Sequence, residues 1–170
     1  MRRALAAAAL LGCSPVALTG CSPALAPESP DGSVREAVAR LATLKPVGTD
    51  PDAVAETFAL DTRSTELQRE ALEKQLLGQP VQWPIKVYEV AQDGEAYKIL
   101  SQPIPITDPS ATPLLRVLAV VFPQSDQDRS AIASLRTGDT VAVKGFVRSI
   151  TLRTVLTVHP AVLAGGPSRT

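Results

Sequence analysis

The chain has 170 residues, 45% of them apolar and 20% charged, a composition typical of one folded domain rather than a disordered chain. Lys plus Arg and Asp plus Glu each total 17, and aromatic residues make up 4%. This balance argues against a general nucleic-acid-binding protein, which needs a basic face and stacking rings. With one histidine and both cysteines within the first 21 residues, a zinc site, a disulfide framework and a Cys or His catalytic centre are nearly excluded.

The N-terminal segment is predicted to direct export. A basic start at residues 1–3 precedes an apolar run at residues 4–11, too short to span a bilayer. Leu18-Thr19-Gly20-Cys21 then resembles a bacterial lipobox, whose cysteine receives the lipid. Leu10-Leu11-Gly12-Cys13 is the alternative, but it would leave a signal of only 12 residues, shorter than the usual 15 to 30. A third possibility is a plain secretory signal with an incidental cysteine.

The lipobox resemblance implies a mature chain that begins at Cys21 and carries more than one acyl chain, such as palmitate, enough for stable anchoring. By resemblance to the enterobacterial sorting rule, Ser22 favours the outer membrane, with the protein facing the periplasm. Three prolines and a glycine in residues 22–32 predict a tether. The predicted segments are therefore a signal at 1–20, a flexible tether at 21–32, a helical segment at 33–77, a β domain at 78–163 and a disordered tail at 164–170.

The helical segment predicts three helices, over 33–44, from 51 onward and over 65–77. Their start signals are Ser33 with Glu36, Asp50 before Pro51, and Thr65 with Gln68, and Gly78 ends the third. The apolar stripe of the third helix must be covered, and the barrel that follows is the nearest cover. We expect the first helix to be held less firmly; alternatively, its stripe of Val34, Val38 and Leu41 binds a partner.

From residue 81 the apolar period changes from helical to alternating, which predicts strands. A phase shift at residues 88–90 predicts a bulge in the first strand, and Asp93-Gly94 predicts a hairpin turn. A further strand near residues 97–99 leads into a loop with four prolines at 101–113. The later elements are a buried strand at 114–122, a helix from Ser125 to about Leu135, and strands at 141–147 and about 154–162.

This element order, β-β-β-α-β-β, predicts a mainly β protein with N-terminal helices and a five-stranded OB-fold barrel. Gly145 interrupts an alternating valine strand, which predicts a bend or a close backbone approach. Residues 135–147 follow the pattern L-x-x-G-D-x-V-x-V-x-G-x-V and resemble bacterial OB-fold domains of the tRNA-anticodon-binding-like family. Residues 78–90 are similar to the opening strand of that family, and the resemblance covers 78–163. It implies the fold, and not tRNA binding, since many members are exported proteins with no assigned activity.

Outward positions of the predicted barrel form a candidate binding face. Residues 78–163 contain 8 basic and 7 acidic side chains, a balance that favours a solvated surface over a polyanion site. We expect the single tryptophan, Trp83, to close the core and His159 to be structural. Asp126 and Asp128 serve a helix start. The candidate face comprises Lys86, Tyr88, Lys98, Arg116, Lys144, Phe146 and Arg148.

These features predict a non-enzymatic, lipid-anchored envelope protein that binds a protein or a periplasmic ligand through its OB fold. No catalytic residue, metal ligand or cofactor is predicted, and the expected partners are the membrane, through the anchor, and a protein. The alternative is a module for nucleic acid or another polyanion, which would need clustered basic residues. An enzyme would need a concave pocket with converging polar groups and strongly perturbed pKa values.

Overall fold

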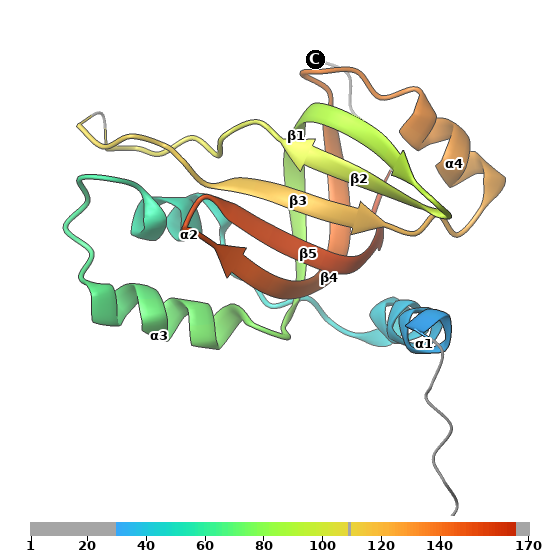
Figure 1. Ribbon diagram of the computed structural model, residues 1–170, viewed down its shortest axis with the longest axis horizontal. Coiled ribbons are helices and arrows are strands. Elements are labelled where there is room, and N and C mark those ends of the chain that lie inside the picture. Colours follow the sequence, from blue (N-terminus) through green and yellow to red (C-terminus); the bar gives the residue numbers. More distant parts are fainter. Residues whose placement is uncertain (1–29, 109, 166–170) are drawn as a thin grey trace, which may run out of the picture.

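The computed structural model describes residues 30–108 and 110–165, with side chains from Ser33 onward. The five strands are β1 (Pro80–Asp93), β2 (Ala96–Ser101), β3 (Arg116–Val121), β4 (Thr140–Thr151) and β5 (Val155–Leu163). They close into a barrel in the order β1-β2-β3-β5-β4, in which only the β3–β5 pair is parallel (Figure 1). The predicted OB-fold barrel is confirmed.

Strand β1 contributes to two sides of the barrel. Its first half pairs with β4 and its second half with β2. The register with β2 shifts between Val87 and Glu89, so Tyr88 is the bulged residue that the phase shift predicted. Strand β3 is shorter than expected, and its outward residues are half-buried rather than buried on both sides, because one face of a barrel wall points outward.

Gly145 lies where β4 and β5 approach most closely. A Cβ atom on this residue would stand 2.6 Å from the Pro160 carbonyl oxygen, 2.6 Å from Val158 Cγ1 and 2.8 Å from Ala161 Cβ. These distances are below van der Waals contact, so only glycine fits without movement of β5. The close approach predicted from the interrupted valine pattern is therefore confirmed.

The helices begin largely as their start signals predict. Helix α2 (Pro51–Phe58) is capped by Asp50, whose side chain accepts a hydrogen bond from the Asp52 backbone. Helix α3 (Glu66–Leu76) has the full capping box of Thr65 and Gln68. Helix α4 (Asp126–Ala133) is capped by Ser125. Helix α1 (Pro30–Thr43) starts three residues earlier than expected, because a proline is compatible with the first helical turn. Ser33 therefore lies within the helix.

The helices extend the barrel core. In Figure 1, α2 and α3 lie at one side of the barrel and α4 at the opposite side. Helix α3 buries Leu76 in the core cluster, as expected, but α2 contributes more buried side chains to it. Helix α1 lies against β5 and β4 and buries Leu41 completely, although we expected it to be held less firmly.

Trp83 is 2% exposed, and its indole nitrogen donates a hydrogen bond to the Thr49 carbonyl oxygen at 2.8 Å. This confirms the predicted core position and ties the α1–α2 linker to β1. Within the described ranges, no helix combines the length and apolar character needed to cross a bilayer. Cys13 and Cys21, most of the predicted tether and the end of the predicted tail lie outside the described residues.

Candidate functional site

The seven residues of the predicted binding face all point out of the barrel, since none of them is buried. The structure does not gather them in one place. Lys86 pairs with Thr140 and Phe146 with Pro80, at opposite ends of the β1–β4 ladder. Alternation along a strand identifies the outer surface of a closed barrel, but not which outward residues are neighbours around it.

Beyond the Lys86 end of the β1–β4 ladder, four of the predicted residues already have partners or border a cavity of their own. The Arg116 guanidinium lies 4.9 Å from the centre of the Tyr88 ring, a cation–π contact. Lys98 forms an ion pair with Asp93 at 2.7 Å. Lys86 borders a cavity of about 470 Å³ whose walls include Pro103 and Pro105.

At the other end, Phe146 and Arg148 border a groove between α1, β4 and β5 that also contains Arg40 and His159. Lys144 lies between the two ends, half-buried, opposite Gln82 of β1 and Val162 of β5. The sequence analysis missed Arg40 because nothing in the pattern of α1 says which strand the helix docks on.

A second surface stands out at the turn between β4 and β5. The Thr154 amide donates a hydrogen bond to the Thr151 carbonyl oxygen at 3.0 Å and closes the turn. Its two central residues, Leu152 and Arg153, have φ angles of 49° and 59°. Positive φ at both positions is the mark of a type I′ turn, which Asn-Gly forms most easily. Leucine and arginine are strained there.

This turn borders an apolar cavity of about 410 Å³, here called the β4–β5 hollow. Leu152 is 86% exposed, and Leu60, which also lines the hollow, is 54% exposed. Asp61, the third non-glycine residue with positive φ in the described ranges, borders the same hollow. The lining residues are Phe58, Ala59, Leu60, Asp61, Arg69, Leu114, Leu152 and Arg153.

Ion pairs and hydrogen bonds hold the rim of the β4–β5 hollow. Glu66, at the start of α3, accepts hydrogen bonds from the Arg153 guanidinium with both carboxylate oxygens and lies 3.6 Å from Arg69. Arg69 also donates to the Thr57 carbonyl oxygen at 3.1 Å. These contacts position the turn against α3. Glu66 is shared between the two arginines, and Asp61 adds a second negative charge to the lining, so the charges at the hollow balance and its exposed leucines offer an apolar surface.

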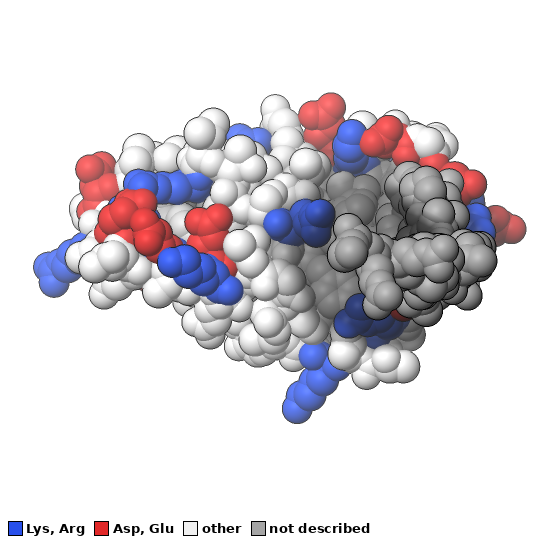
Figure 2. Space-filling view, turned by 60° about the horizontal axis from the view of Figure 1, so that its bottom comes forward, with Lys and Arg blue, Asp and Glu red and all other residues white. Residues whose placement is uncertain are grey.

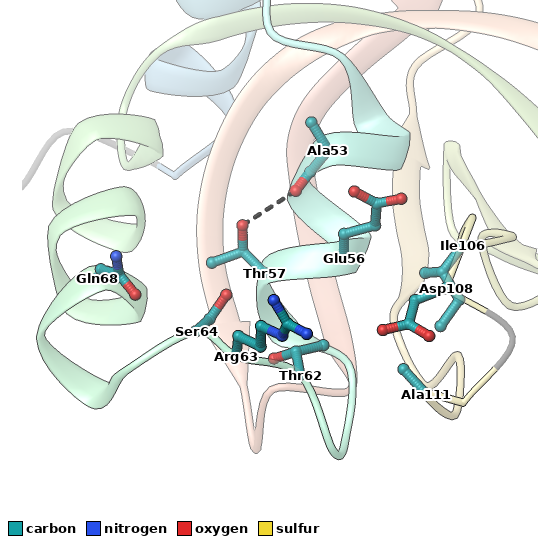
Figure 3. A pocket seen from close by; sticks show the side chains of 10 residues that line it. All are labelled: Ala53, Glu56, Thr57, Thr62, Arg63, Ser64, Gln68, Ile106, Asp108 and Ala111. Atoms are coloured by element: carbon teal, nitrogen blue, oxygen red, sulfur yellow. Dashed lines mark hydrogen bonds between the residues drawn. The ribbon is translucent and has the colours of Figure 1, made fainter.

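A polar pocket of about 360 Å³ between α2, α3 and the β2–β3 loop contains two carboxylates (Figure 3). Hydrogen bonds from the side chain and backbone of Thr107 lower the pKa of Glu56. In the same way, the side chain and backbone of Ser110 lower the pKa of Asp108. Both groups are therefore ionised at neutral pH. A general acid needs the opposite shift, and the hydrogen bonds of both carboxylates tie them to the β2–β3 loop.

Charge is mixed over the part of the surface that includes α3. Acidic and basic side chains alternate around this helix in Figure 2 instead of forming a patch of one sign. Among the residues with described side chains, no three of the His, Cys, Asp and Glu type come close enough to hold a metal ion.

No protein-family model and no curated protein matches the sequence. Solved structures with a similar fold include asparaginyl-tRNA synthetase from Pyrococcus horikoshii, with 16% identity, a TM-score of 0.37 and coverage of 57% of this chain and 22% of the synthetase. A "putative nucleic acid-binding lipoprotein" from Klebsiella pneumoniae subsp. pneumoniae MGH 78578 is 12% identical, with a TM-score of 0.44 and coverage of 75% and 97%.

The OBody AM3L15, solved bound to hen egg-white lysozyme, is 14% identical, with a TM-score of 0.32 and coverage of 56% of this chain and 85% of the OBody. With identities and scores this low, we transfer no ligand or partner from these three proteins to this chain.

Proposed function

We propose that this protein is a non-enzymatic, lipid-anchored OB-fold module of a bacterial envelope, and that it binds a partner protein at the β4–β5 hollow. Leu152 carries the proposal, because its side chain is 86% exposed on a backbone held in the left-handed conformation. A left-handed non-glycine residue costs about 1–2 kcal/mol. In the free protein, the exposed leucine side chain makes no burial contribution that offsets this strain energy. Burial of the side chain against a partner would offset it.

A protein is favoured over nucleic acid by the chemistry of the hollow. Nucleic-acid sites need unpaired basic groups and exposed aromatic rings. Here Arg153 is bound by Glu66, and the aromatic side chain in the lining, Phe58, is buried. Apolar side chains of a protein segment would fit the leucine-lined walls. By analogy of fold, the loop between the fourth and fifth strands is one of the loops with which OB folds contact ligands.

The anchor and the location rest on the sequence. Leu18 to Cys21 supports lipidation of Cys21 and attachment to the envelope, with Ser22 favouring the outer membrane and a periplasmic orientation. The pattern over residues 135–147 supports membership of the tRNA-anticodon-binding-like family. The lowered pKa values of Glu56 and Asp108 argue against one catalytic role, that of a general acid near neutral pH.

Site-specific photo-crosslinking in cells tests the partner surface. A photoreactive amino acid replaces Leu152 in one strain and Leu67 in a control strain; Leu67 is 77% exposed on α3 but does not border the hollow. We expect a discrete protein adduct from position 152 and none from position 67. Equal labelling at both positions, or no adduct at 152, would contradict the proposed surface.

Membrane fractionation tests the anchor separately. Cys21→Ala should abolish incorporation of labelled palmitate and release the protein from the membrane fraction. If lipidation persists in this variant, Cys13 is the lipidated residue instead. Cys13→Ala is the matched control and should keep the lipid.

A further inference from the structure

The groove between α1, β4 and β5, here called the α1 groove, is distinct from the β4–β5 hollow. It has a volume of about 510 Å³, and none of the described residues that line it is an aspartate or glutamate. Arg40 comes from the last turn of α1, Phe146 and Arg148 from β4, and His159 from β5. Small and apolar side chains make up the rest of the lining. The groove therefore combines basic groups with apolar walls.

Among the residues with described side chains, neither arginine of the α1 groove has an acidic partner. None of the ion pairs among residues 33–108 and 110–165 includes Arg40 or Arg148, whereas Arg69, Arg129 and Arg153 are all paired. Glu36 stands four residues before Arg40 on α1 and forms no ion pair with it in these ranges. The Arg40 guanidinium instead lies 6.0 Å from the centre of the Phe146 ring. Two permanent positive charges thus face the groove from a helix and from a strand.

His159 adds a neutral polar group to the same groove. Its ring packs edge-on to Phe122, with 5.8 Å between the ring centres. Burial, and then the charge of Arg148, lower the pKa of His159, so the imidazole is uncharged at neutral pH. A neutral imidazole can donate or accept a hydrogen bond without adding a third charge.

We propose that the α1 groove binds the phosphate group of a phosphate ester between Arg40 and Arg148. Guanidinium groups donate pairs of hydrogen bonds to phosphate and carboxylate oxygens. A carboxylate has two oxygens and is satisfied by one guanidinium fork, whereas two forks, one from α1 and one from β4, match the larger number of phosphate oxygens. The apolar walls accommodate the organic part of the ester. The source of the phosphate is either a soluble ester or a phospholipid headgroup, both of which present anionic phosphate oxygens to the groove.

The test uses the chain from residue 21 with Cys21→Ser, which keeps every described residue and carries no lipid. Because His159 is the only histidine, its imidazole NMR signals report directly on the groove. We expect binding either of sn-glycerol 3-phosphate, which should shift these signals, or of vesicles that contain phosphatidylglycerol. Vesicles of phosphatidylcholine should bind more weakly, because the choline ammonium balances the charge of the phosphate. The titration that succeeds identifies the source of the phosphate.

Arg40→Gln and Arg148→Gln should each weaken that binding about tenfold, the loss expected for a charge-assisted hydrogen bond. Arg136→Gln is the matched control, because it removes the same charge from the α4–β4 loop and does not border the α1 groove; the Gly138 amide of this loop donates to the Val87 carbonyl oxygen in the middle of β1, whereas Phe146 pairs with Pro80 at its start. Absence of binding in both arms, or an equal loss in the Arg136 variant, would overturn the proposal. Crosslinking at Leu152 reports on the hollow alone, so the two proposals fail independently.

Discussion

The hairpin between β1 and β2 and the hairpin between β4 and β5 both reverse the chain between paired strands, but they use different residues to do so. The first has Gly94 at φ 61°, with no atom within 4 Å of a Cβ built on it. The second has Leu152 and Arg153 at similar angles and no glycine. The first turn follows the conformational preferences of its residues, and the second opposes them. The turn that opposes them is also the one that exposes a leucine beside an apolar hollow.

The largest effect is expected within the unusual hairpin but away from its turn. Gly145→Val places atoms into β5, and we expect the free energy of unfolding to fall by about 3 kcal/mol, at the upper end of the usual overpacking range. Urea unfolding measures the change. Gly48→Val is the control, because no atom lies within 4 Å of a Cβ at that position. A variant at 145 as stable as the control would mean that β4 and β5 do not approach closely there.

The next effect has the opposite sign. Replacing Leu152-Arg153 with Asn-Gly supplies the residues that a type I′ turn prefers, and we expect the free energy of unfolding to rise by about 2 kcal/mol. The loss of the exposed Arg153–Glu66 pair offsets only a small part of this gain. Partner crosslinking from position 60 should disappear in the same variant. If the variant is more stable and still crosslinks to the partner from position 60, the strained turn is not needed for partner binding.

The converse substitution makes the ordinary hairpin resemble the unusual one. Gly94→Leu has room for its side chain but forces a leucine into the left-handed region, and we expect a loss of about 1 kcal/mol. Thermal or urea unfolding provides the measurement. If the variant is as stable as the parent, left-handed leucine is tolerated in this barrel and the strain at Leu152 is small.

The smallest effect depends on pH and concerns β5. The folded state favours neutral His159, because burial and Arg148 lower its pKa below the ordinary value of 6.5. The resulting stability is fully present above pH 6.5 and is lost as the pH falls through the lowered pKa of the folded state. Between pH 7.5 and 5.5, urea unfolding should therefore show declining stability, and His159→Gln should flatten the decline. An identical decline in that variant would assign it to other groups.

Much of the barrel was predictable because each strand has a local pattern of apolar residues in its own sequence. Alternation located the strands, the phase shift located the bulge at Tyr88, and the valine strand interrupted by Gly145 located the close approach to β5. The start of α1 was misplaced because Pro30 is tolerated in a first turn, where no amide hydrogen bond is required. The turn at Leu152 and Arg153 was not predicted, because turn rules predict a hairpin where glycine or asparagine is present.

The candidate sites were less predictable, because they depend on which elements meet. All seven predicted residues point outward, yet barrel closure separates Lys86 from Phe146 and leaves Lys98 paired with Asp93. Arg40 reaches the groove only because α1 docks against β4 and β5. Sequence periodicity shows the apolar side of such a helix, but it does not determine the surface on which that side rests.

The hydrogen bond from Trp83 to Thr49 gives the protein a built-in optical reporter. Trp83 is the only tryptophan in the chain, and its indole nitrogen reaches across to the linker between α1 and α2. Its emission therefore responds to the attachment of that linker as well as to burial in the barrel core. Because α1 supplies Arg40 to the groove and is joined to the barrel core through this linker, the wavelength of that emission can follow the docking of the helix in real time, without any added label.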